Sequence, residues 1–133
     1  VFTLTASDTL ENLTYLVENL PEVSFHIAAK TNVSDRLEAF KKYDNVTLYT
    51  NVHHDDIIED LLDQSEIYLD INHWDQVDSI VDRAFEKGKP VFAFDNVVHR
   101  AELGASVFSQ QDPEMMVKEI QRQLFGIAVD TVN

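Results

Sequence analysis

Residues 66–96, EIYLDINHWDQVDSIVDRAFEKGKPVFAFDN, decide the fold of this chain. The stretch contains two short apolar runs, Ile67–Ile71 and Val91–Phe94, which are rich in the β-branched and aromatic residues of strands buried on both faces. Between these runs, apolar residues recur at three- and four-residue steps, which is the period of a helix with one buried face. Gly88 is expected to end that helix, and Pro90 to open the next strand. The order strand, helix, strand predicts a βαβ unit with two parallel strands.

The same alternation of strand-like and helical segments continues on both sides of this unit. Four more strands are predicted, at Val1–Thr5, Val23–Ala29, Val46–Tyr49 and Ser106–Phe108. The first helix is expected to begin at Ser7 or Asp8, with Glu11 completing a capping box. The fourth helix should include Val77, and the last should have Asp112 as its N-cap. We therefore predict an α/β fold, a three-layer Rossmann-like domain with a parallel sheet of five to six strands and helices on both faces.

The composition excludes several classes of protein. With 133 residues, of which 44% are apolar, the chain suits a single Rossmann-like domain, residues 1–133. It begins with Val and enters directly into a strand, so we expect another domain to precede it in a longer protein. No apolar run approaches the roughly 20 residues that cross a bilayer, and no signal peptide is recognised, which favours a cytoplasmic protein without a membrane span. The net charge of −14 would repel a phosphate backbone, so we expect no nucleic acid partner.

The residues that could carry chemistry are expected at one edge of the sheet. Because right-handed crossovers make all strands run the same way, the loops that follow the strands meet at the carboxyl ends, where ligands of open α/β folds bind. Four of the five histidines fall in these loops, and the opposite edge shows no comparable cluster. Asp70 lies in an otherwise apolar strand, so its burial requires either a task in ligand binding or a loop that it caps. The candidate ligand-binding residues are Lys30, Asp70, Asn72, His73, Asp75, Asn96, His99 and Arg100.

Several familiar chemistries lack their motifs. The chain has three glycines and none directly follows a strand, so it has no glycine-rich phosphate loop. It has neither a G-x-S-x-G elbow nor an H-E-x-x-H helix, and without cysteine it has no thiolate metal site. The adjacent loop residues His53, His54, Asp55 and Asp56 make a poor closed metal site. We therefore expect no metal and no cofactor, and we assign no catalytic residue.

The segments SFHIAA (24–29), NVTLYTNV (45–52) and GKPVFAFD (88–95) form a pattern that resembles the carboxyl-terminal Rossmann domain of GT-B glycosyltransferases. More narrowly, YLDINH (68–73), FDNVVH (94–99) and the final amphipathic helix are similar to the bacterial glycosyltransferase-like proteins that modify serine-rich surface adhesins. The resemblance is strongest to the non-catalytic partner subunit of the accessory-secretion glycosyltransferase pair. It extends over nearly the whole chain.

This resemblance implies that the chain is the C-terminal half of a two-domain GT-B protein. In that family this half holds the nucleotide-sugar donor, here expected to be a UDP-sugar, and the N-terminal GT-B domain faces the acceptor. Lys30 and Arg100 would then neutralise the donor diphosphate, and the loop of residues 70–75 would face the sugar and the nucleotide. The implied function is the nucleotide-sugar-binding half of a bacterial glycosyltransferase that transfers hexosyl groups in protein glycosylation. The domain alone should be inactive, because the active site forms between the two halves.

Departures from the family pattern favour another function. Asp75 and Arg83 stand where catalytic retaining members carry two glutamates, and an arginine cannot replace the carboxylate expected to hold the ribose. The glycine that lets the backbone approach the phosphates is replaced by Ala28–Lys30. The alternative is a non-catalytic partner or chaperone module that binds the serine-rich acceptor protein or a catalytic glycosyltransferase subunit. A third hypothesis, a flavodoxin-like receiver domain, needs an acidic cluster after the first strand, where Asp8 supplies only one carboxylate.

Overall fold

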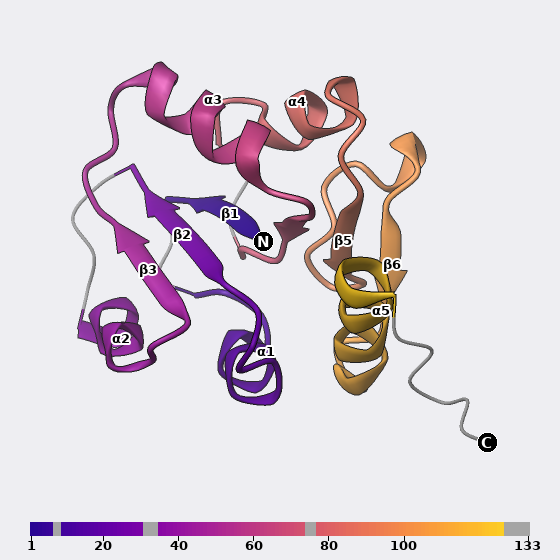
Figure 1. The fold of residues 1–133 in the computed structure, drawn as a ribbon. Coiled ribbons are helices and arrows are strands. Elements are labelled where there is room, and N and C mark those ends of the chain that lie inside the picture. Colours follow the sequence, from indigo (N-terminus) through magenta and orange to yellow (C-terminus); the bar gives the residue numbers. More distant parts are fainter. Residues whose placement is uncertain (7–8, 31–34, 74–76, 127–133) are drawn as a thin grey trace.

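The computed structural model describes residues 1–6, 9–30, 35–73 and 77–126 of the chain. Its centre is a sheet of six strands in the order β3-β2-β1-β4-β5-β6, and every neighbouring pair is parallel. This confirms the predicted α/β fold and the common direction of the strands (Figure 1). The strands are β1 (Phe2–Thr5), β2 (Phe25–Ala29), β3 (Val46–Tyr49), β4 (Tyr68–Asp70), β5 (Val91–Phe94) and β6 (Ser106–Phe108).

Helices cover both faces of the sheet, as predicted (Figure 1). One apolar cluster joins the sheet to α1, α2 and α5, and a second joins it to α3 and α4. The two clusters form because successive side chains of a strand point to opposite faces, so that both faces of each buried strand are apolar. The helices are α1 (Leu13–Asn19), α2 (Asp35–Glu38), α3 (Asp55–Gln64), α4 (Ile80–Glu86) and α5 (Glu114–Phe125), with short 3₁₀ segments at η1 (Ala39–Lys42) and η2 (Ala101–Leu103).

The chain adds β2 and β3 on one side of β1 and β4, β5 and β6 on the other, so the strand order reverses between β1 and β4. β1 pairs with β2 at four positions but with β4 at one, Phe2 with Tyr68. Beyond that position the Tyr68 side chain, in place of backbone pairing, joins β4 to β1. Its hydroxyl accepts a hydrogen bond from the Leu4 amide at 3.2 Å and donates one to the Leu4 carbonyl at 3.4 Å. The Tyr68 ring is fully buried, and this burial raises the pKa of its hydroxyl well above the ordinary value of 10. In open α/β folds, such a switch point is where ligands bind.

Three helix starts differ from the sequence expectation. α1 begins at Leu13 rather than at Ser7 or Asp8, which lie outside the described residues, because the backbone of Leu10 forms an antiparallel bridge with Asn72 instead. α4 begins at Ile80, and Val77 lies outside it. α5 begins after Pro113, one residue later than an Asp112 N-cap implies.

Candidate functional site

The predicted site residues that the structure describes lie at the carboxyl ends of neighbouring strands. Lys30 follows β2, Asn72 and His73 follow β4, and Asn96, His99 and Arg100 follow β5. Asp70 is the last residue of β4. Because every neighbouring pair of strands in the sheet is parallel, the carboxyl ends of β2, β4 and β5 lie at one edge, and the residues share it, as the sequence predicts. Asp75 lies outside the described residues.

Asp70 anchors the loop that follows β5. Its side chain is fully buried, and one of its carboxylate oxygens accepts a hydrogen bond from the His99 backbone N–H at 2.8 Å. The other oxygen lies 2.5 Å from His99 Nδ1. A buried carboxylate is tolerated when such bonds satisfy it, and both oxygens here are used by a single residue. Of the two roles considered for Asp70, the structure shows the fixing of a neighbouring loop, which also fixes the orientation of the His99 ring.

A second group of polar side chains joins three loops of this edge. Oε1 of Glu11 lies 2.6 Å from His73 Nε2 and accepts a hydrogen bond from Asn96 Nδ2 at 3.0 Å. The expected capping role of Glu11 is therefore wrong, and its side chain links the loops after β1, β4 and β5 instead. Sequence reasoning missed Glu11 as an edge residue because its spacing also fits a helix start. The signal that could have located it is its position in the loop after β1.

The chain's own backbone covers the switch point between β1 and β4. Beside the Leu10 to Asn72 bridge, the Glu11 amide donates to the Ile71 carbonyl at 2.8 Å. The His73 amide donates to the Thr9 carbonyl at 3.1 Å. Residues 9–11 are thus bonded to the loop after β4, beside the switch point where open α/β folds bind their ligands.

The two cations expected to meet a diphosphate are both paired with carboxylates of the chain. Lys30 Nζ lies 2.7 Å from Asp78. The Arg100 guanidinium binds Glu102 at 2.7 Å and Asp82 at 2.5 Å. The hydrogen bond to Glu102, followed by the attraction of Asp82 and Glu102, raises the pKa of Arg100 above its usual value. Both of these cations are therefore already paired within the domain.

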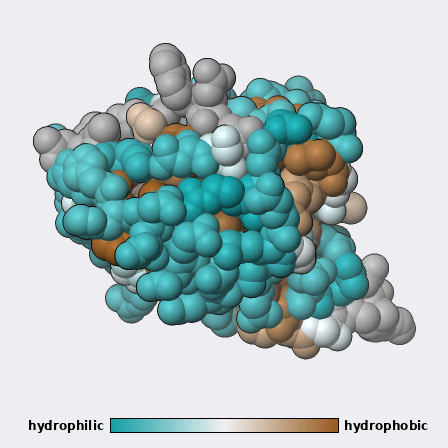
Figure 2. Space-filling view, turned by 90° about the horizontal axis from the view of Figure 1, so that it is seen from above, coloured by the Kyte–Doolittle hydropathy of each residue, from teal (hydrophilic) through white to brown (hydrophobic). Residues whose placement is uncertain are grey.

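Arg83, which the resemblance aligns with the second glutamate of catalytic members, joins two helices here. Its guanidinium binds Asp55 at 3.2 Å and Glu59 at 2.5 Å, and so connects α4 to α3. Lys87 adds bonds to Glu59 and Asp63 across the same helix pair. The hydrogen bonds from Arg83 and then Lys87 hold the pKa of Glu59 below its ordinary value of 4.5. Seen from the side of α3 and α4, the surface is mostly hydrophilic (Figure 2).

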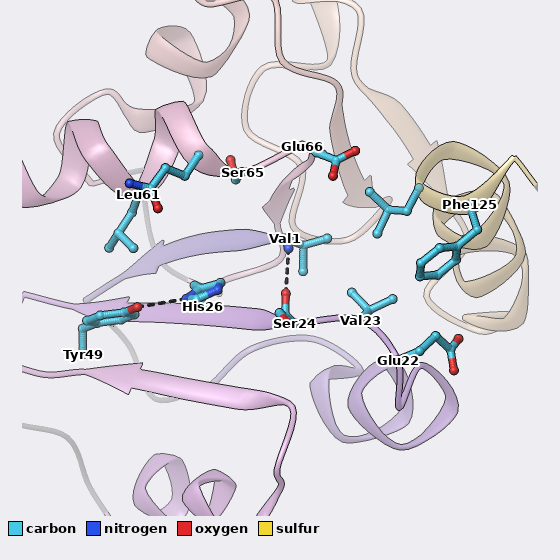
Figure 3. Close-up of a pocket in the computed structure, with 12 residues that line it drawn as sticks. Val1, Glu22, Val23, Ser24, His26, Tyr49, Leu61, Ser65, Glu66 and Phe125 are labelled. Atoms are coloured by element: carbon cyan, nitrogen blue, oxygen red, sulfur yellow. Dashed lines mark hydrogen bonds between the residues drawn. The ribbon is translucent and has the colours of Figure 1, made fainter.

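The amino edge of the sheet contains a groove of about 300 Å³, although the sequence predicts no cluster there. At one end, the His26 and Tyr49 rings stack, with His26 Nδ1 2.9 Å from the Tyr49 hydroxyl (Figure 3). Partial burial lowers the pKa of His26. Phe125 and Glu22 lie toward the other end (Figure 3). Ligands of open α/β sheets bind at the carboxyl edge, so the groove is not the primary candidate site.

Two further features bear on the class of protein. In the described part of the chain, no three His, Asp or Glu side chains gather as a metal site would require. Across the same ranges, every helix is too short or too polar to cross a membrane.

Comparison with protein families identifies the relatives of this chain. Residues 1–127 match the family described as the GftB/GlyA-F C-terminal domain. The chain belongs to this family. Family membership agrees with the resemblance to bacterial glycosyltransferase-like proteins.

Relatives of the chain include proteins named as stabilising proteins and proteins named as glycosyltransferases. The chain is 46% identical over 95% of its length to the UDP-N-acetylglucosamine–peptide N-acetylglucosaminyltransferase stabilizing protein GtfB of Streptococcus agalactiae, and covers 28% of that protein. It is 41% identical over 92% of its length to glycosyltransferase GlyB of Streptococcus pneumoniae serotype 4, covering 30% of it. A crystal structure of a GtfA/B complex bound to UDP and GlcNAc contains a chain that matches with a TM-score of 0.84 and 35% identity, over 96% of this chain and 29% of that one. The chain thus spans less than a third of these relatives.

Proposed function

We propose that this chain is the C-terminal Rossmann-like domain of a non-catalytic subunit that stabilises a bacterial protein glycosyltransferase in the cytoplasm. In this proposal the domain is the second half of a two-domain GT-B-like protein. It contributes to contacts with a catalytic subunit or with the acceptor polypeptide, and it does not hold the nucleotide-sugar donor. The observation that carries the proposal is the internal pairing of the edge cations, Lys30 with Asp78 and Arg100 with Asp82 and Glu102.

Charge decides between the two functions that the sequence leaves open. A donor diphosphate is held by fixed cations whose charge is directed at the phosphates. Here each cation already faces at least one carboxylate, and the chain as a whole carries 24 acidic against 10 basic residues. A diphosphate would have to displace those carboxylates or bind beside them, and either way like charges would repel. Donor binding at this edge is therefore disfavoured.

The backbone geometry supports the same function. Residues 9–11 lie beside the switch point and are bonded to the loop after β4. No glycine follows a strand to let a phosphate approach the backbone. Arg83 replaces a ribose-binding carboxylate and is engaged by α3.

The relatives support both candidate functions to different degrees. The Streptococcus agalactiae relative is named a stabilizing protein, and the GtfA/B complex pairs two subunits. The relative GlyB is named a glycosyltransferase, which keeps nucleotide-sugar binding as the second candidate function.

The test compares donor binding and subunit binding in the full-length protein. We expect millimolar UDP and UDP-GlcNAc to leave its amide spectrum unchanged, while the cognate catalytic glycosyltransferase copurifies with it. The triple variant Asp78→Asn, Asp82→Asn, Glu102→Gln, which removes every carboxylate paired with Lys30 or Arg100 above, should bind UDP more tightly than the parent protein. Glu119→Gln, which removes a paired carboxylate on α5, is the matched control and should not. A parent protein that binds UDP-GlcNAc with a Kd below about 100 μM would overturn the proposal.

A further inference from the structure

A small pocket lies between the first turn of α1 and the helix α2. Its volume is about 130 Å³. Its apolar lining combines the buried Leu13 and Leu37 with the partly buried Leu10 and Phe40. Thr9, which immediately precedes Leu10, contributes a polar group to the same pocket. The pocket therefore adjoins residues 9–11, which cover the switch point, and belongs to the same side of the domain as the carboxyl edge.

Arg36 lines this pocket and differs from the other arginines of the described chain. Its side chain is exposed, and with the described residues its guanidinium makes one hydrogen bond, a long one of 3.5 Å to the Thr9 hydroxyl. Across the described ranges, no carboxylate lies within ion-pair distance of it, whereas Arg83, Arg100 and Arg122 each bind at least one. Because none of the described carboxylates pairs with Arg36, its guanidinium beside an apolar pocket is suited to binding an external carboxylate.

The size of the pocket selects the class of occupant. Sites for drug-sized ligands have volumes of roughly 300–1,000 Å³, so a pocket of about 130 Å³ is too small for a nucleotide sugar. It is large enough for one apolar side chain. Protein interfaces commonly place such an anchor in a pocket and pair it with an arginine, which is among the residues that contribute most to binding.

We propose that this pocket, with Arg36 at its rim, binds a segment of the catalytic glycosyltransferase subunit that presents one apolar side chain next to one carboxylate. The inference rests on the proposed function, because it names the surface by which the stabilising subunit holds its partner. Charge complementarity selects the occupant. A serine-rich acceptor offers hydroxyl groups, whereas the exposed guanidinium of Arg36 is matched by a carboxylate.

The test measures the affinity of the full-length protein for its cognate catalytic subunit. Arg36→Ala should weaken binding about tenfold or more, and Arg36→Glu should weaken it further. Thr14→Trp, at an exposed position that lines the pocket, should weaken binding by filling the space. Arg122→Ala removes an exposed arginine of α5 and is the control, expected to stay within twofold of the parent. Melting curves check that each variant folds.

The outcomes separate this inference from the proposed function. If the parent protein binds the catalytic subunit and the three pocket variants bind with the parent's affinity, the pocket is not the docking site. If the parent protein does not bind the catalytic subunit at all, the proposed function fails and the inference fails with it. Light scattering of the parent protein and of Arg36→Ala tests a second occupant. If the parent self-associates and Arg36→Ala abolishes that self-association, the pocket binds a second copy of this chain and the inference about the catalytic subunit is wrong.

Discussion

Replacing Asp70 with asparagine tests whether this buried carboxylate holds the loop after β5. Asp70 accepts two hydrogen bonds from His99, at 2.8 Å from the backbone amide and 2.5 Å at Nδ1. The asparagine side chain has nearly the same volume, but its amide oxygen can keep only one of them, and its NH₂ cannot accept the other. A hydrogen bond to a charged group contributes about 1.5–3 kcal/mol, so we expect the free energy of unfolding to fall by about 2 kcal/mol. For a domain of this size, that corresponds to a decrease in Tm of roughly 6–10 °C.

Urea denaturation followed by circular dichroism measures this change. The midpoint should fall while the slope with urea stays constant, because the native surface is unchanged. Glu102→Gln is the matched control, since it removes an exposed carboxylate bonded to Arg100 and should leave the unfolding free energy nearly unchanged. If Asp70→Asn is as stable as Glu102→Gln, the Asp70–His99 contact does not fix the loop and the argument fails.

Two other substitutions test the switch point and the helix pair. Tyr68→Phe removes the buried hydroxyl that bonds to Leu4 and should lower the free energy of unfolding by about 1–3 kcal/mol, whereas a Tyr15→Phe control at a partly buried ring should lower it less. If Tyr68→Phe is as stable as the parent protein, the hydroxyl does not contribute to joining β4 to β1. Glu59→Gln tests the ion pairs of α3 and α4. Because Arg83 and Lys87 lower the Glu59 pKa, the carboxylate stabilises the fold above pH 4.5, and this contribution is lost as pH falls through the folded-state pKa. The parent should therefore be more stable than Glu59→Gln at neutral pH, and the difference should be smaller at a pH well below 4.5. An equal difference at both pH values would show that another effect of the substitution dominates.

Much of the fold was predictable from local pattern. All six strands were predicted within two residues of each end, since β-branched and aromatic runs must be buried and their spacing leaves room for a helix between them. The start of α1 was not predicted correctly. In sequence, residues 9–11 fit the beginning of a helix, but in the structure their backbone bonds to the loop after β4. Such a long-range bond leaves no local signal.

The candidate site, like the fold, was predictable from the sequence only in part. The strand directions place Lys30, His73 and His99 at one edge, and the sequence determined this because parallel strands end together. Which charges meet was decided only by the tertiary structure. The pairs of Lys30 with Asp78 and of His99 with Asp70 join residues 48 and 29 positions apart. Sequence specifies which groups are charged, but attraction between them depends on distance, and distance is set only when the chain has folded.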